Sequence, residues 1–396
     1  MFRRMLVLAC LAICASAAGG QDLSNIQIHG FATQGFLYSS NNNYLSTNSS
    51  SGSFAWTDGA VSLSDVVSDK LRVGIQLHMS QLGEFGSGTS PQVDWATGDY
   101  KVNERVGFRA GKYKVPFGLY NDSQDVDAVH QWALLPQGVY PVDNTSFTLS
   151  ALGGEFYGDI RLGKKAGTLV YRGYVGYHTL ALTQGYVKNI DLVLEPIEQR
   201  FGLPQALITS EPYGSVFGGD IRWQTPLKGL LVGSSVLEQN LQGGAGSVTF
   251  HIPRFATTQQ YAKFERGKFL AAFEVKRFPI DFLTTIPTAK GPVVVPTLLD
   301  QRSWYPMVGY RVTEKLQLGT YYSHFVDAGG GANTSLTSRY SKDWTVSGRY
   351  DFNSYFYAKL EEHFVHGVDR DYYADTNLGV IQPRSNILAA KIGFSF

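Results

Sequence analysis

The chain has 396 residues, with 34 Lys and Arg against 33 Asp and Glu, and its formal net charge is +1. This balance argues against a nucleic-acid-binding protein that relies on a basic surface. Only 17% of the residues are charged, whereas Gly (43), Tyr (23) and Phe (24) are numerous, as in strands that carry an aromatic surface.

The first 17 residues have the pattern of a cleaved secretory signal peptide. Two arginines precede an apolar stretch, 5–14, and residues 15–17 match an A-x-A cleavage site. The stretch is too short to span a bilayer. Both cysteines, Cys10 and Cys14, lie in it, so the mature chain, 18–396, is expected to have no disulfide or thiolate site. A lipoprotein cut before Cys10 would leave an apolar stretch too short to act as a signal.

Beyond residue 17, apolar and polar residues alternate in segments of about ten residues, the pattern of strands with one apolar face. Segment 70–79 is the clearest, because five apolar residues from Leu71 to Met79 share one side. No run approaches the roughly 18 apolar residues of a transmembrane helix. Strands are predicted near 25–38, 57–67, 70–80, 91–101, 104–114, 151–162, 167–178, 215–224, 229–239, 256–265, 268–278, 302–313, 315–325, 338–350, 354–365 and 385–396.

The connections alternate between tight turns and long segments such as 115–150, 179–214 and 279–301. This asymmetry predicts an all-β fold, a transmembrane antiparallel β-barrel of about sixteen strands with short periplasmic turns and long extracellular loops. A soluble sandwich or propeller would have shorter and less asymmetric connections, and no repeat of fixed period is visible. Aromatic residues at strand ends predict two girdles, with Trp223, Tyr310, Tyr350, Phe394 and Phe396 on the turn side and Tyr38, Tyr177, Trp304 and Tyr322 on the loop side.

Two stretches carry a resemblance to a known family. Residues 109–120 (RAGKYKVPFGLY), which follow Val93-Asp94-Trp95, resemble the phosphate-selective porins O and P and their relatives. The ending 390–396 (AKIGFSF) is similar to the last strand of outer-membrane barrels, where a C-terminal aromatic residue, here Phe396, is a signal for the barrel-assembly machinery. The resemblance implies a sixteen-stranded, usually homotrimeric barrel of the bacterial outer membrane, with the third long loop folded inward to narrow the pore.

If the apolar strand faces meet lipid, basic side chains outnumber acidic ones on the inner face. The predicted basic set is Lys70, Arg72, Arg105, Arg109, Arg161, Arg172, Arg222, Lys263, Lys276, Arg311, Arg349, Lys359 and Lys391, and the acidic set is Glu155, Asp159, Asp220, Glu274, Asp343 and Glu361. Such a wall predicts a water-filled channel for small hydrophilic solutes with a modest anion preference. Any one of these charges could instead pair with a neighbour across the strands. The set is spread and interleaved with acids, so selection of phosphate is not expected.

Residues 122–136 of the third long loop are predicted to form a short helix, capped by Asp122 or Ser123 and ended by Pro136. Positions 126, 129, 133 and 134 would share its apolar face. The polar side chains Asp122, Asp125, Asp127 and His130 are the candidates for the constriction of the pore. Asp125 and Asp127 could equally serve only the helix dipole.

The alternatives are an enzyme on the barrel wall and an adhesin or receptor that acts through its long loops. No G-x-S-x-G motif is present and the eight histidines show no linked Ser and Asp, so no enzyme is predicted. His363 and His366 lie three apart on a strand and would point to opposite faces, so neither a metal nor a cofactor is expected. The apolar residues of 179–214 and 279–301 are predicted to pack over the barrel mouth rather than to bind a partner.

Overall fold

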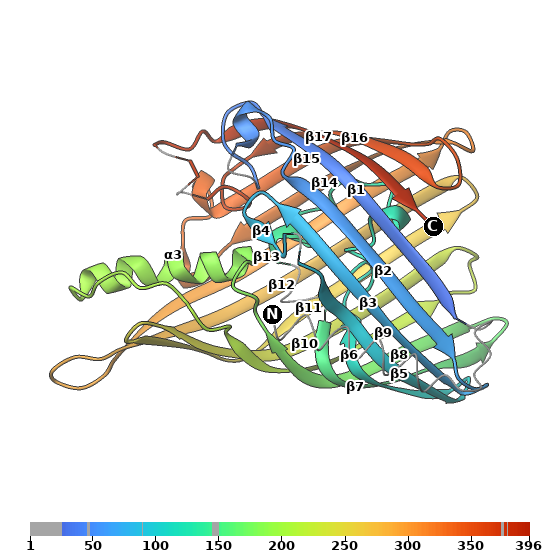
Figure 1. Cartoon of the computed structure of the whole chain (residues 1–396), viewed down its shortest axis with the longest axis horizontal. Coiled ribbons are helices and arrows are strands. Elements are labelled where there is room, and N and C mark those ends of the chain that lie inside the picture. The colour runs from blue at the N-terminus through green and yellow to red at the C-terminus, as the bar shows by residue number, and fades with distance from the viewer. Residues whose placement is uncertain (1–25, 46–47, 89, 145–149, 374–375, 378) are drawn as a thin grey trace.

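The computed structural model describes residues 26–45, 48–88, 90–144, 150–373, 376–377 and 379–396, and the predicted signal peptide lies outside them. The described strands form one antiparallel sheet, shown in Figure 1. Strand β1 (Gln27–Ser39) hydrogen-bonds to both β2 (Trp56–Val66) and β17 (Arg384–Ser395), which closes the sheet into a barrel. Closure gives each of the long strands a hydrogen-bonded neighbour on both sides, as a membrane-spanning sheet requires.

The sixteen predicted strands are confirmed, and the sheet contains one further strand of two residues, β4. The remaining strands are β3 (Leu71–Leu82), β4 (Phe85–Gly86), β5 (Gln92–Asn103), β6 (Val106–Lys114), β7 (Ser150–Gly163), β8 (Gly167–Thr179), β9 (Tyr213–Gln224), β10 (Leu230–Ala245), β11 (Val248–Arg266), β12 (Phe269–Ile286), β13 (Val293–Arg311), β14 (Leu316–Asp327), β15 (Tyr340–Asp351) and β16 (Phe356–His366).

The two faces of the sheet differ as the alternation predicts. On β16, Leu360 and Phe364 are 56% and 49% exposed, whereas Lys359, Glu361 and His363 between and beside them are buried. The outer face of the barrel is therefore apolar and its inner face polar. Exposed aromatic side chains lie near both strand ends, with Trp223, Tyr310, Tyr350 and Phe396 at the turn end and Tyr38, Tyr177 and Trp304 at the loop end.

Strands β10 to β13 are the longest, with 16 to 19 residues, and they project from the loop end of the barrel (Figure 1). The prediction of a loop over 279–301 is wrong, because the β12 and β13 ladder continues until Ile286 pairs with Val293. The reason is burial. Helix α3 (Gly185–Arg200) lies along the projecting strands, and its Ile190 and Leu194 pack in one cluster with Ile280 and Phe282. Burial of these apolar side chains between α3 and the sheet stabilises the projecting parts of the strands.

No helix among the described residues is both long and apolar enough to cross a membrane.

Loops 40–55 and 367–383 dock on each other at the loop end of the barrel. The Asn42 side chain donates to the Gln382 carbonyl at 2.8 Å, and the Leu45 amide donates to the Asp371 carbonyl at 3.0 Å. Asp371 is buried and has a φ of +68°, and the Tyr44 hydroxyl donates to its carboxylate at 3.1 Å. Burial, together with the nearby Asp143 carboxylate, raises the pKa of Asp371 to about 8.

A carboxyl whose pKa is raised in the folded state stabilises the docked loops fully below its ordinary pKa of about 4, and this stability is lost as the pH rises through about 8. We therefore expect the Leu45 amide to exchange its hydrogen more slowly at pH 5 than at pH 8, after correction for intrinsic rates. Asp371→Asn should abolish the difference, because Asn is neutral and tolerates positive φ. Asp281→Asn, at an exposed site on β12, is the control. An unchanged pH dependence in Asp371→Asn would contradict the assignment.

Candidate functional site

The loop between β6 and β7, described over residues 115–144 and here called the third loop, contacts the inner face of many strands. Its amides at 133 and 134 donate to Glu361 at 2.8 and 3.0 Å, and its amide at 119 donates to Glu274 at 3.1 Å. Arg349 donates to the carbonyls of residues 128 and 130, both at 2.7 Å. Lys276 donates to the carbonyl of residue 139 at 3.0 Å. Wall side chains thus satisfy the backbone of this loop.

The predicted helix over 122–136 is wrong, because these residues form only a three-residue 3-10 turn, Asp127–Val129. Carbonyls that a helix would use internally accept hydrogen bonds from Lys359 and Arg349 instead. The predicted apolar face does not exist either, since Val129 is 64% exposed and Leu134 is buried. Contacts with the wall outweigh local helix propensity here.

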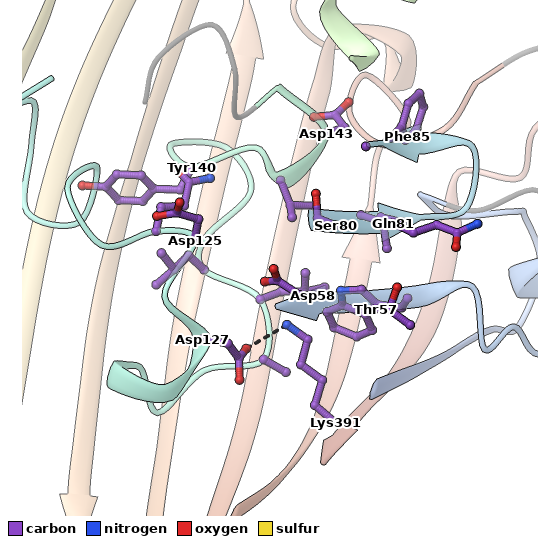
Figure 2. Close-up of a pocket in the computed structure, with 18 of the residues that line it drawn as sticks. Thr57, Asp58, Ser80, Gln81, Phe85, Asp125, Asp127, Tyr140, Asp143 and Lys391 are labelled. Carbon is purple, nitrogen blue, oxygen red and sulfur yellow. Dashed lines mark hydrogen bonds and ion pairs between the residues drawn. The ribbon is translucent and has the colours of Figure 1, made fainter. Parts of the chain in front are cut away.

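Asp127 has more side-chain partners than the other carboxylates of the third loop, and Figure 2 shows its contact with Lys391. Its oxygens lie 2.9 Å from Lys359 Nζ and 2.8 Å from Lys391 Nζ, and the Tyr357 hydroxyl donates to it at 2.9 Å. Lys359 also donates to the carbonyls of residues 127 and 132. Burial raises the pKa of Asp127, but the two ammonium groups outweigh burial and hold the pKa below its usual range. Two strands therefore anchor one loop carboxylate.

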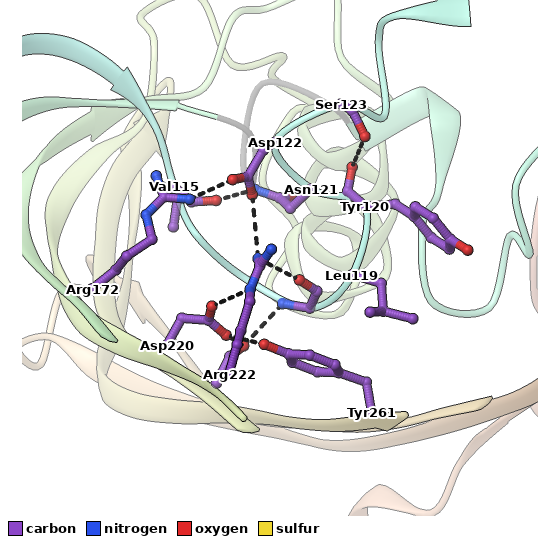
Figure 3. A network of polar contacts seen from close by, with 12 residues as sticks. Val115, Leu119, Tyr120, Asn121, Asp122, Ser123, Arg172, Asp220, Arg222 and Tyr261 are labelled. Atoms are coloured by element: carbon purple, nitrogen blue, oxygen red, sulfur yellow. Dashed lines mark hydrogen bonds and ion pairs between the residues drawn. The ribbon is translucent and has the colours of Figure 1, made fainter. Parts of the chain in front are cut away.

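Asp122 lies between two arginines of the wall (Figure 3). It forms a short ion pair with Arg172, and it lies 3.8 Å from Arg222. Arg222 also pairs with Asp220 at 2.6 Å and donates to the Gly118 carbonyl at 3.0 Å. This network links the first residues of the third loop to β8 and β9.

The other two constriction candidates also have partners. Asp125 pairs with Lys114 at 2.5 Å, and Lys114 pairs with Asp94 at 2.6 Å. A ring nitrogen of His130 lies 2.6 Å from the Ser123 carbonyl. Burial lowers the pKa of His130 to about 4, so its ring is neutral at pH 7 and this nitrogen carries the donated proton.

The structure brings three of the thirteen predicted basic residues of the inner face together, and Arg349, Lys359 and Lys391 bind the third loop as described above. Arg109 bridges Asp99 at 2.7 Å and Glu155 at 3.1 Å, and Arg172 also pairs with Glu155, next to Arg222. The others are spread along the wall. Four of them are exposed at or next to the turns: Lys70, Arg105, Arg161 and Arg311. Arg72 donates to Gln27 and Ser64, and Lys263 pairs with Glu265. Lys276 donates to the third loop.

Sequence reasoning missed several charged residues of the inner face, among them Asp58, Asp94, Asp99 and Lys114. Asp94 is the extra residue of a β-bulge, because Gln76 pairs with Trp95 while Leu77 pairs with Val93. The bulge lets Asp94 reach Lys114 and Gln76 although its neighbour Trp95 also contacts Gln76. Strict alternation carries no signal for such an inserted residue. With these acids and those of the third loop, the inner charges nearly balance.

Four cavities border the third loop, one of them a small recess at Phe117 and Pro141. The largest, about 520 Å³, is lined by Arg72, Arg109, Lys114 and Arg172 with Asp99 and Asp122 as its acids. A second, about 320 Å³, lies beside Val129, His130 and the turn ends of β11 to β15. The cavity of Figure 2 is only about 70 Å³ and is lined by Asp58, Asp125, Asp127 and Asp143 with Lys391 and His78. The cavity of Figure 2 is thus narrow and acidic, whereas the cavity at Arg72 is wide and basic.

A buried cluster of Thr, His and acidic side chains lies on β15 and β16. Thr345 Oγ1 and Asp343 both lie 2.9 Å from the same ring nitrogen of His363, and the other nitrogen faces Glu361 at 3.3 Å. Thr345 and His363 are both fully buried, so the hydroxyl is not exposed to a solute in this structure. In the described part of the chain, no three His, Cys, Asp or Glu side chains are arranged to hold a metal ion.

The barrel and its loop can be compared with solved structures. The chain matches OmpT of Vibrio cholerae with a TM-score of 0.56 and 10% identity, over 95% of this chain and 99% of that one. It matches an anion-selective porin from Comamonas acidovorans with a TM-score of 0.57 and 10% identity, over 94% and 99%. The chain has the porin fold. OmpF of Salmonella typhi, in complex with daunomycin, matches at 0.56 with 13% identity over 94% and 97%, and Vibrio cholerae OmpT is also known in a trimer form. No protein-family model and no curated protein sequence matches this porin-fold chain.

Proposed function

We propose that this protein is a porin of the bacterial outer membrane, a water-filled channel for the passive diffusion of small hydrophilic solutes. The observation that carries the proposal is the closed barrel with an apolar outer face and a charged inner face, to whose side chains the third loop is hydrogen-bonded. That loop, folded inside the barrel, is the constriction. It would restrict passage to the cavities beside it and so select for small solutes.

The proposal includes export through the signal peptide, insertion by the barrel-assembly machinery with Phe396 at the chain end, and a homotrimer in outer-membrane lipid. The trimer form of Vibrio cholerae OmpT supports the last point. No cofactor and no catalysis are part of the proposal. The matched solved structures support a porin fold without supporting the phosphate-selective subgroup.

We further propose a modest anion preference, set by the wide cavity at Arg72, Arg109 and Arg172, where cations outnumber acids. In a planar bilayer under a salt gradient, the purified protein should give stepwise conductance with an anion-favouring reversal potential. Arg72→Gln, which removes an exposed charge, should shift the reversal potential toward cations, whereas Arg302→Gln on the outer face should not. A cation-favouring wild type would assign selectivity to the narrow acidic cavity, and absence of conductance from folded protein would refute the porin.

A further inference from the structure

Beneath helix α3, at the loop end of the barrel, two connected cavities have features of a binding site. The upper cavity, about 250 Å³, and the lower, about 30 Å³, share Tyr186, Gln301 and Arg370 as lining residues. Asn189 and Leu192 of α3 are only half-buried where they line the upper cavity, so it is not sealed from solvent. The lower recess has room for a small polar group only, whereas the upper cavity can hold the body of a small molecule.

The lower recess contains two cationic side chains and several buried polar atoms without a hydrogen-bond partner. Lys276 donates to the carbonyl of residue 139, and Arg370 donates to Gln301 at 2.9 Å. In the described part of the chain, neither of them forms an ion pair with a carboxylate. Gln239 and Thr257 are each 1% exposed, and their side-chain polar atoms, like Arg370 Nε, have no hydrogen-bond partner among the described residues.

Buried polar atoms are seldom left unpaired in a folded protein, because each then loses its hydrogen bonds to water without replacement. Two cationic side chains beside the unpaired Gln239 amide and Thr257 hydroxyl favour an acceptor that carries negative charge, and a carboxylate has the right size and charge. The upper cavity is different, because one part of its lining is apolar, with Ile190, Val193, Ile280, Phe282 and Leu299. A bound molecule would therefore have a charged end and an apolar body.

The acids of the upper cavity limit the class further. Asp327 is already bound, with Arg339 at 2.8 Å and the amides of residues 300 and 329 at 3.0 Å. Asp369 lines the upper cavity with one carboxylate oxygen that has no partner among the described residues. A second negative group in the upper cavity would face this carboxylate, so a dicarboxylate fits worse than a monocarboxylate.

We propose that these two cavities bind a small amphipathic monocarboxylate, with its carboxylate between Lys276 and Arg370 and its apolar body under α3. The inference rests on the proposed function, because it names a solute class that the channel mouth would capture. It differs from the general charge preference of the pore, since it requires an apolar body as well as a negative charge.

The test is to measure by calorimetry how tightly the purified, folded protein in detergent binds hexanoate, hexanamide and adipate. Hexanoate should bind at least about tenfold more tightly than either of the others, and Lys276→Gln or Arg370→Gln should weaken it about tenfold, the effect of one lost charged hydrogen bond. Leu299→Trp, which fills the upper cavity and keeps both charges, should abolish binding. Lys342→Gln, on the outer face, should bind as the wild type does.

Folding of each variant is checked by heat-modifiable migration. Hexanoate that binds no better than hexanamide, or that binds Leu299→Trp and Lys276→Gln unchanged, would overturn the inference. Because calorimetry needs no membrane, the two proposals fail separately. A protein that conducts but does not bind hexanoate remains a porin without this site, and one that binds hexanoate but does not conduct keeps the site and loses the channel.

Discussion

Asp127→Ala is expected to undock the middle of the third loop and to raise the conductance of the channel. The substitution leaves the buried ammonium groups of Lys359 and Lys391 without their shared counter-ion, which now lies within 2.9 Å of both. Breaking a buried ion pair by removal of one partner costs about 3–5 kcal/mol. The protein can avoid part of this cost by letting water reach the lysines, and this requires the loop to move away from β16 and β17.

Two measurements check this expectation: the temperature at which the folded band disappears in heat-modifiable migration, and the single-channel conductance. The first should fall and the second should rise. Asp281→Ala, at an exposed carboxylate, should change neither. Asp127→Ala combined with Lys391→Met should recover part of the stability, because it removes one of the two uncompensated charges. If Asp127→Ala alone changes neither stability nor conductance, Asp127 does not anchor the loop.

The strands could be predicted from the sequence because their signal is local. Each strand shows its apolar face in its own alternating residues, as Leu71, Val73 and Ile75 do, and the tight turns separate one strand from the next. The error over 279–301 has a related cause. The apolar residues there alternate as strands do, but their burial depends on α3, which lies about a hundred residues earlier in the chain.

The course of the third loop could not be predicted, because its partners are far away in the sequence. The loop carbonyl of Asp127 meets Lys359 across 232 residues, and the amide at 133 meets Glu361 across 228. A polar and apolar pattern that fits a helix over 122–136 says nothing about these distant donors and acceptors. The charged residues Asp122, Asp125 and Asp127 could be singled out by type, but their partners are fixed only when the barrel closes.

Gly118→Ala is expected to destabilise the start of the third loop. Gly118 has a φ of +67°, which costs a residue with a Cβ about 1–2 kcal/mol. The new Cβ would also lie 2.2 Å from Gln259 Nε2 and 2.7 Å from the Tyr140 hydroxyl oxygen. These neighbours cannot easily move, because Gln259 donates to Glu274 and Tyr140 donates to Glu274 as well. Crowding of this kind adds about 1–3 kcal/mol.

The matched control is Gly267→Ala, in the turn between β11 and β12. Gly267 has a similar φ of +61°, but a Cβ there would meet no atom within 4 Å, so only the backbone cost remains. Gly118→Ala should therefore lower the temperature at which the folded band disappears in heat-modifiable migration clearly more than Gly267→Ala does. It should also alter the conductance, because the Gly118 amide donates to Ser235 at 2.9 Å and its carbonyl accepts from Arg222. Equal effects of the two variants would mean that the loop adapts at Gly118, and that the contacts with Gln259 and Tyr140 do not fix its position.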